Sequence, residues 1–314
     1  MTAPITFVLG CTGCGKGALG RELASRVGGE IVSIDSMKVY RRMDIGTAKP
    51  SPAHRAAVPH HLIDVSEPSE EFSVAQYVEQ ADAAIADIGG RGCPVFVVGG
   101  TPLYVKSLLD GLFEGPGADE QVRARLRAEV ESIGAGALHG RLTEVDPQAA
   151  ERIHPNDLRR VFRALEVYEL TGKPISSLQA QWDRQRRYEA TILTLRRSRE
   201  EQSQRTNERV RRMIDAGLVD EVESLVAERL PLSATARKAV GYAEIIQHLA
   251  GSVSLAEAIE MIKINTRQLA KSQRTWFKRF ENVTWVDLAD DDTVHSVADD
   301  LTTQFETLWS RSPK

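Results

Sequence analysis

The chain has 314 residues, of which 42% are hydrophobic and 27% charged, and its formal net charge is −4 at pH 7. This length allows one large domain or two ordinary ones, and the composition is ordinary for a globular protein. No apolar run approaches the roughly 20 residues that a membrane helix needs, and the first residues lack the pattern of a secretory signal peptide. We therefore expect a cytoplasmic protein and exclude a membrane partner.

The first elements predict an α/β fold. The segment "ITFVLG" (5–10) predicts a buried strand, a helix is expected over about 15–27, and "IVSID" (31–35) predicts a second strand. Another helix has Ser73 as its expected N-cap, and "CPVFVVGGT" (93–101) is typical of a strand buried on both faces. Strands that alternate with helices in this way indicate right-handed βαβ units in a parallel sheet.

The middle of the chain differs from its two ends. From about residue 113 the pattern is mostly helical, and "ATILTL" (190–195) predicts a strand that returns to the sheet. Helices are expected over about 198–216, 218–229, 239–249 and 254–280, followed by a short strand and a closing helix. The predicted division is an α/β core of residues 1–113 and 186–314, with a helical insertion of residues 114–185.

A glycine-rich loop, "GCTGCGKG" (10–17), lies between the first strand and the first helix. It follows the phosphate-loop pattern G-x-x-x-x-G-K-[ST] up to its last position, where Gly17 replaces the hydroxyl that contacts Mg²⁺. Backbone N–H groups, a lysine and a helix N-terminus together attract phosphate. The predicted phosphate-binding residues are Gly10, Cys11, Thr12, Gly13, Cys14, Gly15, Lys16 and Gly17.

Two pairs of residues invite a metal interpretation. Cys11 and Cys14 form C-x-x-C, but no second Cys/His pair lies at zinc spacing, and the third cysteine, Cys93, is isolated. Reduced thiols within a phosphate loop are the favoured interpretation. His60 and His61 are adjacent at the start of a strand, where their side chains point to opposite faces. We expect structural roles for both histidines and assign no metal ligand with confidence.

The position of an aspartate at a strand end tests whether this chain is an ATPase or kinase of the phosphate-loop class. An ATPase or kinase needs an aspartate for Mg²⁺ at the end of a second apolar strand. The run "VFVVGGT" ends in glycines and Thr101 instead, whereas "IVSID" ends in Asp35, at the edge of the sheet where ligands bind. The missing hydroxyl at Gly17 also argues against a small-molecule kinase.

Basic residues cluster in a chain that is acidic as a whole. Residues 261–280 contain six basic side chains and no acidic one, and further basic stretches lie at 152–163, 183–199 and 205–212. Such clusters favour a polyanionic ligand over simple solvated helix faces.

Six segments, in order along the chain, resemble the tRNA dimethylallyltransferase family. They are "GCTGCGKG", "SIDSMKVYRRMDIGTAKP", "PHHLIDV", "VVGGTPLYVKSLLDG", "RIHPNDLRRVFRALEVYELTGKP" and "TRQLAKSQRTWFKRF". The resemblance implies an α/β fold with a P-loop NTPase-like parallel sheet flanked by helices, and a mostly helical insertion that contacts tRNA. It also implies transfer of a dimethylallyl group from dimethylallyl diphosphate to N6 of adenosine 37 in tRNAs, which gives N6-(dimethylallyl)adenosine (i6A37) and diphosphate.

The resemblance also implies roles for individual residues. The loop 10–17 would bind the diphosphate, and Asp35, Thr101 and Arg209 would be catalytic, with Asp35 accepting the proton of the adenine amine. The implied tRNA-binding residues are Asp35, Ser36, Met37, Lys38, Thr101, Arg123, Arg159, Arg160, Val161, Phe162, Arg163, Arg267, Lys271, Arg274 and Lys278. The spacing of the last four puts them on one helix face, while Leu269, Trp276 and Phe280 can face the core.

Cofactor and partners follow from the same resemblance. Mg²⁺ is expected, held mainly through diphosphate and water, because Gly17 stands where the family usually has Thr or Ser. Lys38 also departs from the family, in which Gln is common at that position. The expected partners are the tRNA anticodon stem-loop and dimethylallyl diphosphate, and we expect a monomer.

Three alternatives stay open at this stage. The first is a small-molecule kinase, and the second is a related transferase that prenylates free AMP or ATP. The third is a non-catalytic RNA-binding protein with a decayed phosphate loop. The sequence leaves open which tRNAs are modified, and whether the prenyl group is modified later.

Overall fold

The computed structural model describes residues 3–112, 115–178, 186–289 and 293–309. The chain divides into two units, Met1–Leu108 with Tyr188–Lys314, and Leu109–Arg187. The boundaries predicted from the sequence, 113/114 and 185/186, fall on or beside residues outside the described ones. Separate clusters of buried apolar side chains lie in the two units, so each has a core of its own.

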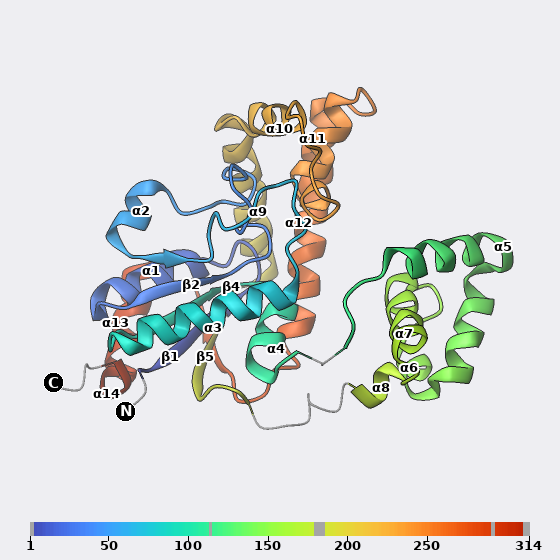
Figure 1. Ribbon diagram of the computed structural model, residues 1–314. Helices are drawn as coiled ribbons and strands as arrows, with labels where there is room; N and C mark the ends of the chain where they lie inside the picture. Colours follow the sequence, from blue (N-terminus) through green and yellow to red (C-terminus); the bar gives the residue numbers. More distant parts are fainter. Residues whose placement is uncertain (1–2, 113–114, 179–185, 290–292, 310–314) are drawn as a thin grey trace. The chain divides into compact units, whose positions relative to one another are not determined.

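A parallel sheet with strand order β3-β2-β4-β1-β5-β6 organises the first unit (Figure 1). The central strand β1 pairs with β4 and β5, and its side chains Phe7, Val8 and Leu9 are fully buried. The continuous apolar runs of the sequence are explained by this burial on both faces. The strands are β1 (Ile5–Gly10), β2 (Glu30–Ile34), β3 (His60–His61), β4 (Val95–Gly99), β5 (Ala190–Arg196) and β6 (Thr284–Asp287). The predicted α/β fold is confirmed.

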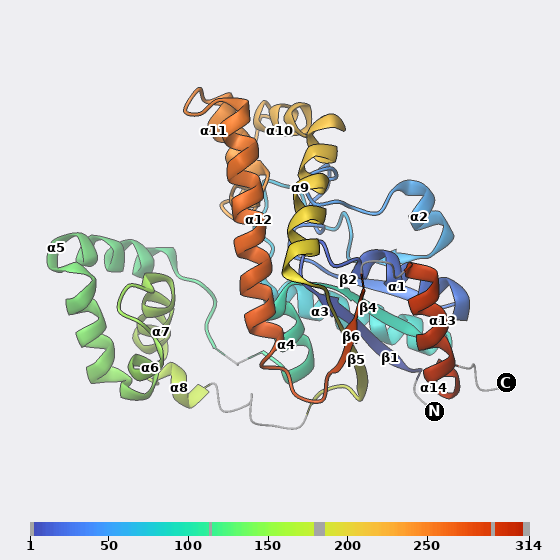
Figure 2. The same ribbon diagram turned by 180° about the vertical axis from the view of Figure 1, so that it is seen from behind.

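Helices cover both faces of this sheet. α3 (Val74–Gly90) lies on one face, whereas α1 (Lys16–Val27) and α13 (Val294–Gln304) lie on the other, as Figures 1 and 2 show from opposite sides. The side chain of Ser73 accepts a hydrogen bond from the Gln76 N–H, which confirms the predicted N-cap of α3. The remaining helices nearest the sheet are α2 (Pro52–Ala57), α4 (Pro102–Asp110) and α14 (Glu306–Trp309).

α9 and α12 lie side by side in both views and pack against each other (Figures 1 and 2). The helices of this part are α9 (Arg199–Asp215), α10 (Leu218–Val226), α11 (Tyr242–Leu249) and α12 (Leu255–Phe277), with a short 3₁₀ turn at Ala236–Lys238. The buried face of α12 includes Ala270, Gln273 and Phe277. The predicted core position of Leu269 is wrong: this side chain is 42% exposed, because the buried residues recur at 270, 273 and 277, one position away from it.

The second unit is helical throughout its described residues. It contains α5 (Glu120–Val145), α6 (Pro147–Arg152), α7 (Leu158–Thr171) and α8 (Ile175–Leu178). Gly134 interrupts α5 with φ 82° and ψ 163°, and the helix bends sharply between its two halves (Figure 1). Leu126, Leu142 and Leu165 pack in a core between α5 and α7.

Candidate functional site around the phosphate loop

The loop between β1 and α1 presents backbone N–H groups at a helix N-terminus. Gly13 (φ 82°) and Gly15 (φ 98°) have left-handed backbone conformations that residues with a Cβ rarely adopt. The amides of Gly13, Gly15, Lys16 and Gly17 donate to no group among the residues that the structure describes. Four free donors and the positive end of a helix dipole form an anion site.

Glutamine side chains from two distant helices hold the loop in place. Gln273 on α12 accepts a hydrogen bond from the Thr12 N–H (2.8 Å) and donates to the Gly100 carbonyl (2.6 Å). Gln202 on α9 donates to the Thr12 carbonyl (2.9 Å). A Cβ at Gly100 would lie 2.9 Å from both the Gln273 Nε2 and the Gly10 carbonyl oxygen, so only glycine permits this approach. The Thr12 amide is therefore bonded to Gln273 in this structure and is not among the free amides of the loop.

Two arginines of the α9 region bind loop carbonyls. Arg197 Nε donates to the Cys14 carbonyl (3.3 Å), and Arg205 Nε donates to the Gly13 carbonyl (3.2 Å). These bonds hold the carbonyl groups of the loop toward the arginines, so the neighbouring N–H groups stay available for an anion. The sequence placed Arg197 and Arg205 in basic stretches, but it did not predict their contact with the loop, and it missed Gln202 and Gln273, because these residues lie far from the loop along the chain.

Asp35 and Thr101 come together at the carboxyl edge of neighbouring strands. The pairing of Ile34 on β2 with Gly99 on β4 brings the two strand ends level. Asp35 Oδ1 accepts from the N–H groups of Met37 (3.0 Å) and Lys38 (3.4 Å). Thr101 Oγ1 accepts a hydrogen bond from the Ser36 N–H (3.0 Å). The Thr101 hydroxyl donates to the Ser36 hydroxyl oxygen (3.4 Å).

Positive charge gathers around the Asp35 carboxylate. Burial lowers the pKa of Lys38 to about 8, Asp35 opposes that shift, and the charges of Lys16, Arg209 and Arg21 add to it. Burial also lowers the pKa of Arg209, again with Asp35 acting in the opposite sense. Arg209 Nη1 donates to the Thr12 hydroxyl (3.3 Å), which ties this arginine to the loop. Four cations beside one carboxylate leave an excess of positive charge that a polyanion would neutralise.

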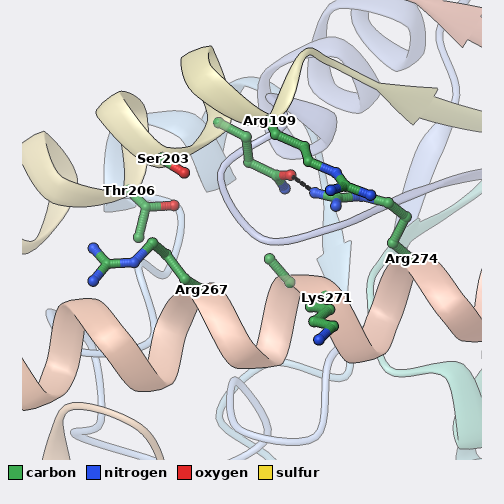
Figure 3. A pocket seen from close by; sticks show the side chains of 8 residues that line it. Arg199, Ser203, Thr206, Arg267, Lys271 and Arg274 are labelled. Carbon is green, nitrogen blue, oxygen red and sulfur yellow. Dashed lines mark hydrogen bonds between the residues drawn. The ribbon is translucent and has the colours of Figure 1, made fainter.

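A basic cavity of about 240 Å³ lies between α9 and α12 (Figure 3). Arg267, Lys271 and Arg274 enter it from α12, and Arg267 Nη1 donates to the Asn207 side chain (2.8 Å). Arg274 donates to the Gln202 side chain, which is itself bonded to the loop. Arg199, Gln202, Ser203, Thr206 and Ala270 complete the lining. Lys278 does not line the cavity: it caps the end of α12 and is exposed.

The predicted tRNA-contacting residues of the second unit have different surroundings. Glu166 is fully buried and accepts from Arg123 Nε (2.8 Å) and Arg163 Nη1 (2.7 Å). Arg159 and Arg160 are exposed on α7. The Val161 side chain is fully buried, and Phe162 packs against the core of the unit. These two side chains therefore support α7, which presents the exposed arginines to solvent.

The loop offers no hydroxyl at position 17 as a ligand for Mg²⁺. No group of three or more His, Cys, Asp or Glu side chains suited to a metal exists among the described residues. Cys11 and Cys14 are free and buried, and burial raises the pKa of the Cys11 thiol. His60 and His61 have separate partners, the Val58 carbonyl (2.6 Å) and Glu30 (2.8 Å).

Comparison with known proteins assigns the family. The model of the IPP transferase family matches residues 38–280. The chain belongs to this family. It is 49% identical over 284 residues to a tRNA dimethylallyltransferase of Geobacter metallireducens, which covers 90% of this chain and 92% of that one. It is 44% identical to the tRNA dimethylallyltransferase of Symbiobacterium thermophilum, covering 98% and 97% of the two chains.

Solved structures of family members have the same fold. A tRNA isopentenylpyrophosphate transferase from Bacillus halodurans matches with a TM-score of 0.70 at 40% identity, over 97% of each chain. A eukaryotic dimethylallyltransferase, solved in crystallographic snapshots of its action on tRNA, matches with a TM-score of 0.83 at 28% identity. That match covers 100% of this chain and 82% of the other.

One segment on which the resemblance depends has a structural role. In "DIGTAKP" (44–50) the N–H groups of Asp44, Ile45 and Gly46 all donate to Glu221, at 2.9, 2.8 and 3.1 Å. Tyr242 donates to the same carboxylate (2.5 Å) and packs over Gly46, where a Cβ would collide with its ring. This segment therefore holds α10 and α11 against the connection between β2 and α2.

Within the described residues, no helix is long and apolar enough to span a membrane.

Proposed function

We propose that this protein is an enzyme that transfers a dimethylallyl group from dimethylallyl diphosphate to N6 of adenosine 37 in tRNA. The products are N6-(dimethylallyl)adenosine and diphosphate. The observation that carries the proposal is the gathering of an anion-binding loop, Asp35 and an excess of cations at one sheet edge. Membership of a family whose relatives are tRNA dimethylallyltransferases gives this arrangement its substrate.

The reaction breaks one bond and forms another. The N6 lone pair of adenine attacks C1 of the dimethylallyl group, the C1–O bond breaks, and its electron pair stays on the departing diphosphate. Asp35 accepts the N6 proton, so atoms and charges balance. Because the adenine lone pair is delocalised into the ring, alignment of N6 with C1 and a nearby base contribute most to the rate.

Charge on the departing diphosphate is met by fixed donors. The free amides of the loop, Lys16 and Arg209 are available for this role, and they are positioned before the reaction starts. Thr101 is held through Ser36 beside Asp35, close to where the adenine must lie. Mg²⁺, if bound with the diphosphate, would be held by diphosphate oxygens and water and would supply further positive charge, because the loop has no hydroxyl at position 17.

The tRNA is bound through its anticodon stem-loop. Adenosine 37 leaves the stacked loop to reach Asp35, as enzymes that act on a base require. Residues 35–38, the exposed arginines of α7 and the basic residues of α12 are the proposed contacts, with Arg123 and Arg163 acting through their buried Glu166. We also propose that the protein acts in the cytoplasm as a monomer.

A transfer assay tests the proposal. Purified protein is incubated with Mg²⁺, labelled dimethylallyl diphosphate and an anticodon stem-loop that contains A36-A37-A38. We expect a labelled product that contains N6-(dimethylallyl)adenosine at position 37 only, and none when position 37 is guanosine. Free AMP is tested in parallel: transfer to AMP without transfer to the RNA would contradict a tRNA substrate, and ATP-dependent phosphorylation would indicate a kinase.

A further inference from the structure

Arg21 occupies the space in front of the one loop position that departs from the phosphate-loop pattern. It lies on α1 four residues after Gly17, on the same helix face. Helical side chains point back toward the N-terminus, and Arg21 Nη1 lies 3.6 Å from the point where a Cβ at position 17 would be. A hydroxyl at position 17 would therefore stand beside this guanidinium group.

The Arg21 guanidinium group has no partner within the described residues, which distinguishes it from the next arginine of the same helix. Arg21 forms neither a hydrogen bond nor an ion pair with any described residue, although it is half-buried. Arg26 pairs with Glu22 (2.8 Å) and Asp299 (2.6 Å). No described carboxylate neutralises this guanidinium group, so it is available to bind an anion that enters the site.

The charge of Arg21 acts within the same site. It lowers the pKa of Lys38, on the segment that begins with Asp35, and it lowers the pKa of His60 on β3. Its own pKa is lowered by burial. Arg21 is therefore one of the cations, with Lys16 and Arg209, whose charges act on Lys38 near Asp35.

We propose that Arg21 binds the diphosphate over Gly17 and supplies the positive charge that a protein-bound Mg²⁺ supplies in loops with Ser or Thr at that position. The inference rests on the proposed diphosphate site and identifies how this chain manages without the hydroxyl. A guanidinium group forms paired, charge-assisted hydrogen bonds with phosphate oxygens, so it can replace both the charge and the fixed geometry of a metal. It also repels a divalent cation from position 17.

Calorimetric binding of inorganic diphosphate, without RNA or prenyl group, tests this. The wild-type protein is expected to bind diphosphate in EDTA, and Mg²⁺ should improve its affinity by less than about threefold. Arg21→Met should weaken binding about tenfold or more in EDTA, the effect of losing a charge-assisted pair, and less when Mg²⁺ is present. Arg26→Met, the same change one turn further along α1, should alter neither affinity.

Two more variants separate loss of the charge from loss of structure. Arg21→Lys keeps the charge and should bind diphosphate in EDTA within about threefold of the wild type. The double variant Gly17→Thr with Arg21→Met should bind weakly in EDTA and regain affinity when Mg²⁺ is added. Thermal denaturation of each variant shows that it is folded.

Three results would overturn the inference. One is an effect of Arg21→Met no larger than that of Arg26→Met, and another is a wild-type protein that binds diphosphate only with Mg²⁺. The third is an equal loss with and without Mg²⁺, because Arg21 would then not stand in for the metal. None of these measurements requires prenyl transfer, so a failed transfer assay and a failed Arg21 experiment are distinguishable.

Discussion

The Asp35 side chain has two tasks that one substitution can separate. Its Oδ1 atom accepts from two backbone N–H groups that shape the segment 35–38, and its charge is the base of the proposed reaction. Asp35→Asn keeps an acceptor oxygen and removes the base. We expect kcat to fall by about 10²- to 10⁴-fold while the dissociation constant for tRNA changes by less than about threefold.

Single-turnover prenyl transfer and filter binding to the stem-loop measure the two quantities. Asp35→Ala removes the acceptor as well, so it should also weaken RNA binding. If Asp35→Asn weakened binding as much as it slowed transfer, Asp35 would be a structural residue.

Lys38 makes ligand binding depend on pH. Its folded-state pKa of about 8 lies below the ordinary value of 10.5, so below about pH 8 the protein contains a charged amine that burial disfavours. This cost to stability is relieved as the pH rises from about 8 towards 10.5. A bound anion raises the pKa, so diphosphate binding at pH 8.5 should take up a proton on Lys38.

Calorimetry in buffers with different ionisation enthalpies measures that uptake. The difference between the wild type and Lys38→Gln should be about half a proton or more at pH 8.5, and near zero at pH 6.5. The variant should also unfold at a higher temperature than the wild type at pH 7 without ligand. Equal proton uptake in both proteins would show that Lys38 does not respond to the anion.

Among the elements, α12 helps to shape the loop although it is distant in sequence. Gln273 joins the Thr12 N–H to the Gly100 carbonyl, and both bonds lie in buried or half-buried surroundings. Gln273→Leu leaves both groups unpaired, which should lower the free energy of unfolding by about 1–3 kcal/mol and weaken diphosphate binding.

Gln273→Glu is the matched comparison. It keeps an acceptor for the Thr12 amide and loses the donor to Gly100, so we expect an intermediate effect on diphosphate affinity. Urea denaturation and calorimetry measure the two properties. If Gln273→Leu left diphosphate binding unchanged, the bridge would not be needed for the shape of the loop.

The basic face of α12 should make RNA binding depend on salt. Lys271 is exposed at the edge of the cavity between α9 and α12, whereas Arg267 and Arg274 already donate to neighbouring side chains. Lys271→Ala should therefore lower the slope of log Kd against log salt by about one unit for the stem-loop.

Arg26→Ala, in the last turn of α1 and paired with Glu22 and Asp299, is the charge control and should leave the slope unchanged. Equal slopes for the wild type and Lys271→Ala would show that this part of α12 does not contact phosphate.

At the scale of the whole molecule, each unit has its own core, so a substitution can destabilise one unit without destabilising the other. Glu166 is fully buried between Arg123 and Arg163, and although burial raises its pKa, hydrogen bonds from Arg163, the Asp119 N–H and Arg123 outweigh that effect and lower it. A lowered pKa gives stability that is present at neutral pH and lost as the pH falls through and below about 4.

Glu166→Gln should destabilise the helical unit by roughly 2–4 kcal/mol, less than a fully buried pair would, because both arginines are partly exposed. Hydrogen exchange should rise in residues 119–178, while diphosphate binding by the other unit stays unchanged. Glu129→Gln, whose pair with Arg141 is half-exposed, should have a much smaller effect. A loss of diphosphate binding in Glu166→Gln would contradict the independence of the two units.

Local patterns in the sequence determined the loop, the sheet and the family. Apolar runs with glycines after them predict the parallel strands and the loop at the end of β1, because burial on both faces and a tight turn leave clear local signals. Asp35 and Thr101 were also within reach of sequence reasoning, since parallel strands end at one edge of the sheet.

Only the tertiary structure decided what surrounds these residues. Gln273 and Gln202 reach Thr12 from 261 and 190 residues away, and no local pattern encodes such a contact. The buried face of α12 ran through Phe277 and left Leu269 exposed, because the packing partners of a helix select its face within an ambiguous apolar stripe. The sequence could not predict the unpaired guanidinium group of Arg21 over Gly17. An arginine in a helix has many possible partners, and only the packing shows that none of the described residues binds it.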